Sequence, residues 1–199
     1  MPPLCLRIGK SLIETVPAVK SLGVIFNEHL SWNDHVDMVM NKLSKVVGIL
    51  CRLRYFMPKS IKKMLYSALF SSVIKYCFLV WGTTSFTNIN RLYLLQKKAV
   101  RNIMNAPRLE HTEPFFNELR IIRLPQLYEV LLLQRYKTGV NHNNCNMLNL
   151  SGLQCNEPKY TTRATPKWYV PRMRTNYGYQ MLSYTLPHQL NKESELMYS

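Results

Sequence analysis

The sequence predicts a mainly α-helical protein, with a short N-terminal β-hairpin, a helical bundle and a poorly ordered basic and aromatic tail. Through the middle of the chain, apolar residues recur every three or four positions, which is the spacing of one helix face. The first residues read as short strands around a turn at 9–11, and the periodicity ends after Gly139. We therefore divide the 199 residues into a hairpin at 1–29, a helical domain at 30–140 and an irregular tail at 141–199.

One glycine interrupts the N-terminal strands. The stretch VKSLGVIF, residues 19–26, predicts a single strand with Gly23 in its interior. Because glycine has no Cβ, it marks a bulge or a place where another backbone comes close. A short hairpin is not stable alone, so we expect it to pack on the helices or to belong to a larger sheet.

Five helices are expected after the hairpin, over about 31–57, 60–81, 87–106, 113–119 and 125–138. The first begins at Ser31, whose spacing to Asp34 suits a capping box. Gly82 is a natural C′ residue for the second helix. The buried faces of the first and third helices are expected to consist of Val36, Val39, Met40, Leu43, Val46, Val47, Leu50 and Leu53, and of Ile89, Leu92, Leu95, Ala99 and Ile103.

The charge of the chain points to a polyanionic partner. Its formal net charge is +15, and its isoelectric point is about 9.8. Residues 38–109 contain 13 Lys or Arg and no Asp or Glu. Such a span favours a phosphate-facing surface, with nucleic acid the first candidate and an anionic membrane the second. The alternative is an ordinary basic surface.

Cysteine usage and hydropathy predict the location. Five cysteines, an odd number without paired spacing, predict no disulfide framework, and no signal peptide is visible. We expect an intracellular protein, in the cytoplasm or the nucleus. Residues 64–90 carry a single charge, Lys75, but Ser67, Ser71 and Ser72 interrupt them. A membrane span needs about 20 predominantly apolar residues, so we expect a buried core helix here and no membrane contact.

Neither a catalytic constellation nor a metal site is predicted. The sequence contains none of the motifs GxxxxGK[ST], GxGxxG and GxSxG. Asp34 and Asp37 fall in the first turn of a predicted helix, where acidic side chains favour the positive helix end. His142, Cys145 and Cys155 are only three potential ligands, with an unusual gap for zinc. We therefore expect no catalytic residue, no metal and no cofactor in this chain.

Two basic segments are candidate nucleic-acid contacts. In LQKKAVR, Lys97, Lys98 and Arg101 lie within about one helical turn and can face one phosphate backbone, unless they form a solvated outer face. In the tail, Arg172 and Arg174 are expected to bind phosphate while aromatic rings stack on unpaired bases. The alternative is that these rings pack the tail on the helices. The rings are those of Trp168, Tyr169, Tyr177 and Tyr179.

Five motifs, in order along the chain, carry a family resemblance. They are VKSLGVIFNEHLSWNDHV, YCFLVWG, LQKKAVRNI, HTEPFFNELRI and PRMRTNYG. Together they resemble the C-terminal part of reverse transcriptases from Jockey-type non-LTR retrotransposons, from the primer grip through the thumb and downstream. These enzymes are RNA-directed DNA polymerases of transposable elements. The resemblance covers about residues 4–185.

The resemblance implies a primer-grip hairpin. Lys20, Leu22 and Gly23 match the family's K-x-L-G element, which holds the 3′ end of a primer. Ser21 departs from a position that is often aromatic in the family, which affects side-chain contacts there rather than the approach of the backbone.

The resemblance also implies a thumb-like helical domain that clasps a template–primer of RNA or RNA–DNA. Lys97, Lys98 and Arg101 match the family's basic thumb helix. Trp81 and Gly82 match its WG pair, which implies packing and a helix end.

The family's catalytic palm carries an aromatic-x-Asp-Asp turn, and no such tetrapeptide occurs in the 199 residues. The resemblance therefore implies a fragment that retains primer grip and thumb, lacks the carboxylates that bind Mg²⁺ in the parent enzyme, and is inactive alone. Its expected partners are the template–primer and the missing palm and fingers of the parent polymerase. The alternatives are a non-enzymatic RNA- or DNA-binding or interaction protein derived from such an element, and an unfolded remnant.

Overall fold

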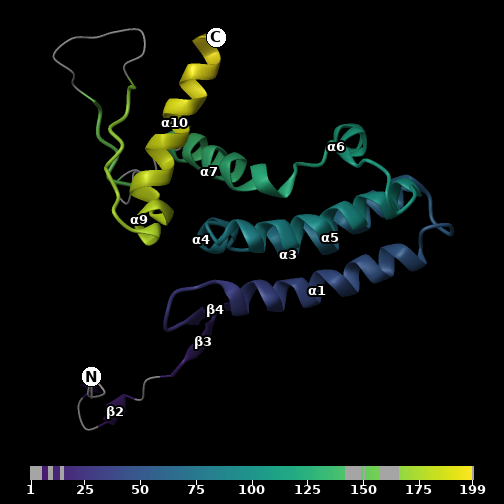
Figure 1. The fold of residues 1–199 in the computed structure, drawn as a ribbon, viewed down its shortest axis with the longest axis horizontal. Helices are drawn as coiled ribbons and strands as arrows, with labels where there is room; N and C mark the ends of the chain where they lie inside the picture. The colour runs from purple at the N-terminus through teal and green to yellow at the C-terminus, as the bar shows by residue number, and fades with distance from the viewer. Residues whose placement is uncertain are drawn as a thin grey trace. The chain divides into compact units, whose positions relative to one another are not determined.

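The protein is mainly helical, as the sequence predicts (Figure 1). A computed structural model describes residues 6–8, 11–13, 16–141, 149, 151–156 and 166–198. The chain forms two compact units, Met1–Ile121 and Ile122–Ser199. This boundary lies before the expected one at 140–141, so the helix that begins at Leu124 belongs with the C-terminal residues.

The strands form two separate antiparallel pairs, β1 (Leu6–Ile8) with β2 (Ser11–Ile13), and β3 (Ala18–Ser21) with β4 (Val24–Asn27). The predicted single strand over 19–26 is therefore wrong, because Leu22 and Gly23 are the turn between β3 and β4. The pairing of Ser21 with Val24 leaves two residues in the turn. Gly23 lies at the tip of a hairpin and not inside a strand.

The helices of the first unit are α1 (Asn33–Arg52), α2 (Lys59–Leu65), the π-helix η1 (Tyr66–Ser71), α3 (Ser72–Lys75), α4 (Phe78–Trp81), α5 (Phe86–Met104) and α6 (Glu113–Leu119). α1 and α5 lie side by side (Figure 1). Asn33 and Asn88 join their first turns, and Arg54 donates to the Ala106 carbonyl beyond their last turns. The two helices therefore run in the same direction, and the segment between them runs back.

The predicted helix faces build the core of this unit. On α1, Val36, Val39, Leu43 and Leu50 are buried as expected, whereas the other predicted positions are half-buried or lie beyond the helix. On α5, four of the five predicted positions are buried: Leu92, Leu95, Ala99 and Ile103. Among the described residues, no helix is long and apolar enough to cross a membrane.

The start of α1 differs from the predicted capping box. The helix begins at Asn33, and no side chain caps it. Instead, Asn27 at the end of β4 bonds the Ser31 hydroxyl at 2.7 Å, the Ser31 N–H at 2.8 Å and the Asp34 carboxylate at 3.2 Å. Because Asn27 occupies the groups that a capping box would use, these bonds tie the hairpin to α1.

The predicted continuous helix over 60–81 is interrupted. After α3, Tyr76 is extended with ψ 117° and Cys77 is left-handed with φ 50°. The Trp81 indole N–H donates to the Tyr76 carbonyl at 3.0 Å and so satisfies a group that the break exposes. Trp81 is buried and ends α4 as the WG pair implies, but Gly82 is right-handed, with φ −69°.

A buried lysine joins the far ends of the bundle. Lys62 of α2 is 1% exposed. Its ammonium donates to the carbonyl of Arg54 at 2.9 Å, to the carbonyl of Asn102 at 3.3 Å and to the Asn105 side chain at 2.6 Å. These acceptors lie at the ends of α1 and α5, where carbonyls lack helical partners and the helix dipole is negative. Burial, with a contribution from Arg54, lowers the pKa of Lys62.

The second unit contains α7 (Leu124–Asn141), α9 (Asn176–Gln180) and α10 (Leu182–Tyr198). α7 packs on α10, where Glu129 accepts from Gln189 at 3.0 Å and from Lys192 at 3.4 Å. The prediction of an irregular tail holds over 166–175 and is wrong over Asn176–Gln180 and Leu182–Tyr198, which are helical. Leu186 and Leu190 of α10 are buried one turn apart, a signal too short to stand out among polar neighbours.

Replacing Lys62 by methionine should reduce the free energy of unfolding by about 2–3 kcal/mol, because the half-buried Arg54 carbonyl, the buried Asn102 carbonyl and the Asn105 side chain lose their donor. Urea unfolding followed by circular dichroism measures the change. Lys63→Met, at the neighbouring half-buried position, is the control and should change stability by less than about 0.5 kcal/mol. Equal stability of the two variants would show that the Lys62 contacts do not hold the bundle.

Candidate nucleic-acid interface

The tip of the β3–β4 hairpin has an unusual conformation. Leu22 has φ +47° and Gly23 has φ +82°, so both central residues of the two-residue turn are left-handed. This is the pattern of a type I′ turn, which favours Asn or Gly at the first position. Leu22 is nevertheless a leucine, and it is 87% exposed. The tip thus combines a disfavoured backbone with an exposed apolar side chain, and such outliers gather at functional sites.

Three contacts dock the hairpin on the helices. Val24 is buried at the start of β4. The Ile25 N–H donates to Nδ1 of His35 on α1 at 3.3 Å. The Tyr76 hydroxyl, at the end of α3, donates to the Leu22 carbonyl at 2.6 Å. The backbone of the turn is therefore held on both sides while the Leu22 side chain points to solvent.

Lys20 lies beside this tip. It is exposed on β3 and pairs with Ile25 across the hairpin. The structure thus brings together the three residues that the resemblance assigns to the primer grip, Lys20, Leu22 and Gly23.

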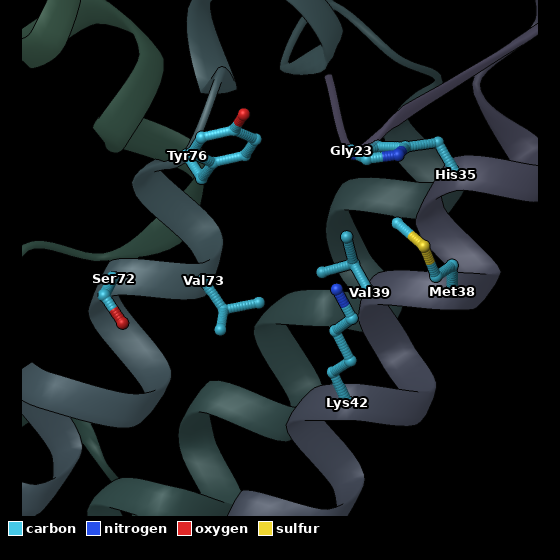
Figure 2. Close-up of a pocket in the computed structure, with 8 residues that line it drawn as sticks. All are labelled: Gly23, His35, Met38, Val39, Lys42, Ser72, Val73 and Tyr76. Atoms are coloured by element: carbon cyan, nitrogen blue, oxygen red, sulfur yellow. The ribbon is translucent and has the colours of Figure 1, made fainter. Parts of the chain in front are cut away.

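A cavity of about 320 Å³ lies beneath the tip, between α1 and α3 (Figure 2). Gly23 forms its rim, and Figure 2 places Tyr76 across the gap from His35. The Lys42 ammonium points into the gap between the two helices. The lining residues are Gly23, His35, Met38, Val39, Lys42, Ser72, Val73 and Tyr76.

His35 is part of the core of the first unit. It is 2% exposed, and its ring packs on Trp81 with 5.1 Å between centroids. Burial, with a smaller contribution from the Lys42 charge, lowers the pKa of His35. Since Nδ1 accepts the Ile25 N–H, the neutral imidazole carries its proton on Nε2. The hairpin is thus docked on the neutral form of His35.

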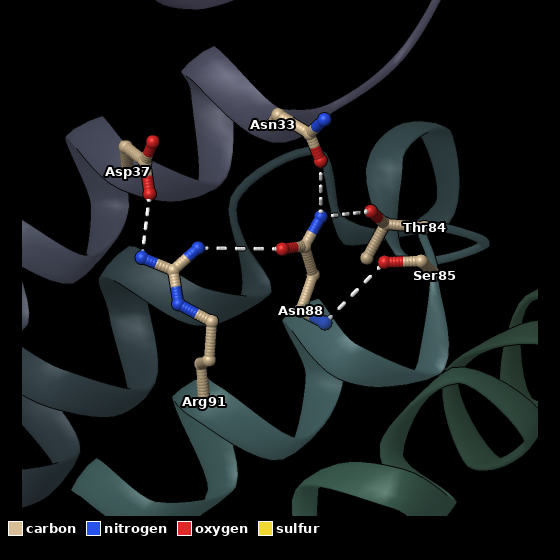
Figure 3. A network of polar contacts seen from close by, with 6 residues as sticks. All are labelled: Asn33, Asp37, Thr84, Ser85, Asn88 and Arg91. Atoms are coloured by element: carbon tan, nitrogen blue, oxygen red, sulfur yellow. Dashed lines mark hydrogen bonds and ion pairs between the residues drawn. The ribbon is translucent and has the colours of Figure 1, made fainter.

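A polar network fixes the start of α5 on the start of α1 (Figure 3). The Asn88 side chain donates to Asn33 at 2.8 Å and to the Thr84 hydroxyl at 3.0 Å, and it accepts from Arg91 at 3.4 Å. Arg91 also forms an ion pair with Asp37 at 2.7 Å. The acidic residue Asp37 therefore has a structural partner, as Asp34 has in Asn27.

The basic residues of α5 are used in different ways. The Lys97 ammonium lies 4.4 Å from the centroid of the Tyr93 ring. Arg101 donates to the Glu110 carbonyl at 2.9 Å and so braces the segment after α5. Lys98 is exposed, whereas Lys97 and Arg101 are half-buried. Of the three, Lys98 is the best placed to meet a phosphate.

The predicted contacts of the tail lie in the second unit. Met173 lies against Gly178, where an added Cβ would approach its side chain to 3.0 Å, while Arg172 and Arg174 on either side are exposed. Asn191 of α10 binds the backbone of Trp168 through two hydrogen bonds, at 2.9 and 2.8 Å. The irregular segment is thus anchored at both ends with its arginines outward.

The aromatic rings of the tail divide between the two expected roles. Trp168 is half-buried and tied to α10, and Tyr179 packs edge-on against Tyr184 with 4.9 Å between centroids. Tyr169, Tyr177 and Tyr179 remain about half exposed. Trp168 and Tyr179 therefore support the packing alternative, while Tyr169, Tyr177 and Tyr179 retain accessible surface for a base.

The sequence interpretation missed the residues of the cavity. His35, Lys42 and Tyr76 are not among the contact residues that the sequence predicts. A signal was present for α1, because His35, Val39 and Lys42 follow each other at four and three residues and so share a face. No such signal existed for Tyr76. Its hydroxyl bonds the Leu22 carbonyl of the hairpin, and it lies where the predicted helix over 60–81 breaks, next to Cys77.

The potential metal ligands are only partly described. His142 and Cys145 lie outside the described residues, and Cys155 is exposed. Within the part of the chain that the structure describes, no three His, Cys, Asp or Glu residues come together as a metal site.

The chain was compared with models of protein families, with curated proteins and with solved structures, and none of the three comparisons gave a match. What the chain does is therefore inferred from its residues and their geometry.

Acidification should loosen the docked hairpin. Because the pKa of His35 is lowered in the folded state, the unfolded chain binds the proton first as pH falls below about 6.5. The free energy of unfolding should therefore be constant above about pH 6.5 and fall below it, by at most about 1.4 kcal/mol per pH unit. Urea unfolding at about pH 7 and about pH 5 measures the loss.

His35→Gln keeps an acceptor for the Ile25 N–H and removes the titrating group, so its stability should change less between these two pH values. His29→Gln, at an exposed histidine, is the matched control and should retain the loss seen in the wild type. An undiminished loss in His35→Gln would assign the acid sensitivity to another group.

Proposed function

We propose that the chain is the primer-grip and thumb part of a Jockey-type reverse transcriptase and that it binds template–primer nucleic acid inside the cell. The observation that carries the proposal is the conformation of the hairpin tip. Leu22 is left-handed and 87% exposed, and it lies between Lys20 and the cavity rim at Gly23. In a complex with nucleic acid, the Leu22 side chain would contact a sugar or base, and the Lys20 ammonium would bind a phosphate.

The tip is unfavourable for stability alone. Asn or Gly at position 22 would relieve the left-handed backbone, and a polar side chain would avoid exposing leucine to water. The docking contacts of Val24, Ile25 and Tyr76 hold the turn in this state despite that cost. Strain that the surroundings maintain at an exposed tip supports a binding role for Leu22.

The charge of the first unit supports the same partner. The acid-free span over 38–109 includes α2, α3, α4 and α5 entirely and contains 13 Lys or Arg, all of which except Lys62 keep exposed surface. Such a surface binds phosphates without reading sequence, as a clasp on a template–primer requires. Lys98 of α5 is one exposed member, and Arg172 and Arg174 of the second unit add a further phosphate-binding segment.

Nucleotide addition is assigned to the palm of the parent polymerase. The 199 residues contain no aromatic-x-Asp-Asp turn, and the close acidic pair Asp34 and Asp37 is engaged by Asn27 and Arg91. Two metal ions held by carboxylates are needed for nucleotidyl transfer. The palm and fingers, with their Mg²⁺, are therefore proposed partners of this chain.

The purified chain should not extend a primer. A primer-extension assay with an RNA template, dNTPs and Mg²⁺ should leave the primer unchanged, because the metal-binding carboxylates are lacking. Extension should return when the parent's palm and fingers are supplied on a separate chain. Processive, dNTP-dependent extension by the chain alone would contradict the proposal. If the chain binds the template–primer but primer extension does not return with the added palm and fingers, the result would favour a non-enzymatic binding protein.

Leu22→Asn should separate stability from binding. It should raise the free energy of unfolding by about 0.5–1 kcal/mol, because Asn suits the left-handed turn. It should weaken binding to an RNA–DNA template–primer by about tenfold, which corresponds to roughly 1.4 kcal/mol of lost contact. Fluorescence anisotropy with a labelled primer measures the affinity. Unchanged affinity in this variant would remove Leu22 from the interface.

Leu109→Asn is the matched control, since Leu109 is 90% exposed in the same unit but outside the hairpin. It should leave affinity nearly unchanged. Salt titration separates the two kinds of contact, because Lys98→Gln should lower the log–log slope by about one, while Leu22→Asn should leave the slope unchanged.

A further inference from the structure

Binding of the template–primer backbone by a basic surface does not explain the size and the chemistry of the cavity beneath the hairpin tip. Its volume of about 320 Å³ lies at the lower end of the range for small-molecule sites, roughly 300–1,000 Å³. It is built from three elements, with α1 and α3 as walls and the tip at Gly23 as rim (Figure 2). A space of this size suits a single monomer unit rather than a duplex or a helix.

The walls offer a flat ring and an apolar lining. Met38 and Val39 on α1 and Val73 on α3 supply the apolar surface. Tyr76 is 54% exposed, and its hydroxyl is held by the Leu22 carbonyl, so the orientation of its ring is fixed. A fixed aromatic ring beside an apolar wall is the surface on which nucleic-acid bases stack, at about 1–3 kcal/mol per base.

The rim leaves that ring uncovered. A Cβ at position 23 would lie 3.6 Å from Cε1 of Tyr76, which is ordinary van der Waals contact. Any longer side chain would therefore cover the edge of the ring. Gly23 serves the left-handed turn and at the same time keeps the Tyr76 ring open toward the cavity.

The charge of the cavity selects an anion. Among the described residues that line it, Lys42 is the one that is charged at neutral pH, because His35 is held neutral by the Ile25 N–H and by burial. The Lys42 ammonium points into the gap between α1 and α3 (Figure 2). None of the residues that line the cavity is Asp or Glu. The two acids of α1, Asp34 and Asp37, are engaged by Asn27 and Arg91, so no lining carboxylate opposes a phosphate.

We propose that this cavity binds one unpaired nucleotide, with its base against the Tyr76 ring and its phosphate on the Lys42 ammonium. The shared chemistry is one aromatic base and one phosphate, which a free mononucleotide or the unpaired end of a strand can supply. Where a strand supplies it, the inference rests on the proposed template–primer binding, and the cavity then receives a terminal nucleotide that has left its duplex.

Two RNA–DNA hybrids with a recessed DNA 3′ end test the inference. One is fully paired, and the other ends in a single unpaired 2-aminopurine nucleotide. The wild type should bind the unpaired end about fivefold more tightly, and the 2-aminopurine emission should change on binding because the base stacks. Equal affinity for the two hybrids would overturn the inference, and the proposed function would stand if both hybrids bind.

Matched variants assign the effect to the cavity. Lys42→Gln should bring the affinity ratio close to one, whereas Lys45→Gln, at an exposed lysine of the same helix outside the cavity, should retain it. Ser72→Trp should fill the cavity and also remove the preference, and Ser67→Trp is its control. All four positions are exposed, so the variants should fold. Equal behaviour within either pair would overturn the assignment.

Adenosine monophosphate and inorganic phosphate distinguish the remaining outcomes. Adenosine monophosphate that binds the wild type but not Lys42→Gln supports the cavity even when neither hybrid binds, and in that case the template–primer function alone fails. Competition by inorganic phosphate that equals that of adenosine monophosphate would show recognition of charge only and would overturn the nucleotide assignment. Failure of both hybrids and of adenosine monophosphate would overturn both proposals.

Discussion

The contacts of the Lys62 ammonium are the constraint on which the first unit depends. Three acceptors from the ends of α1 and α5 converge on it, and it comes from the segment that runs back between them. A lysine can reach all three because its donors rotate on a long stem. The alignment of two helices that lie far apart in the chain is thereby set at one end, and the Asn88 network sets it at the other.

The hairpin and its cavity follow from this alignment. His35 and Tyr76 can hold the turn only because α1 and α3 stand at a fixed separation, and Tyr76 reaches the Leu22 carbonyl across 54 positions of sequence. The break at Cys77 turns the chain away from α3, and the buried Trp81 stabilises the carbonyl left at Tyr76. The exposed leucine and the basic cavity are thus presented by a rigid support, which suits residues that bind a partner.

In the second unit, side chains and backbone also hold basic residues in place. Asn191 holds one end of the irregular segment through hydrogen bonds to the Trp168 backbone. At the other end, the Met173 side chain packs against Gly178. Because Met173 is half-buried, its two neighbours Arg172 and Arg174 are exposed, although the segment has no regular secondary structure. Arg172 and Arg174 thus gain defined positions from the anchored residues beside them.

The sequence by itself determined the helical class, the buried faces of α1 and α5 and the acid-free basic span, because periodicity and charge are local properties of a chain. The tertiary structure decided the rest. Gly23 moved from a strand to a turn because pairing register depends on both strands, and the middle helix broke at Cys77 although no glycine or proline marks the site. The contact of Lys62 with Asn102 joins residues 40 positions apart and that of Tyr76 with Leu22 joins residues 54 positions apart, which no local pattern records.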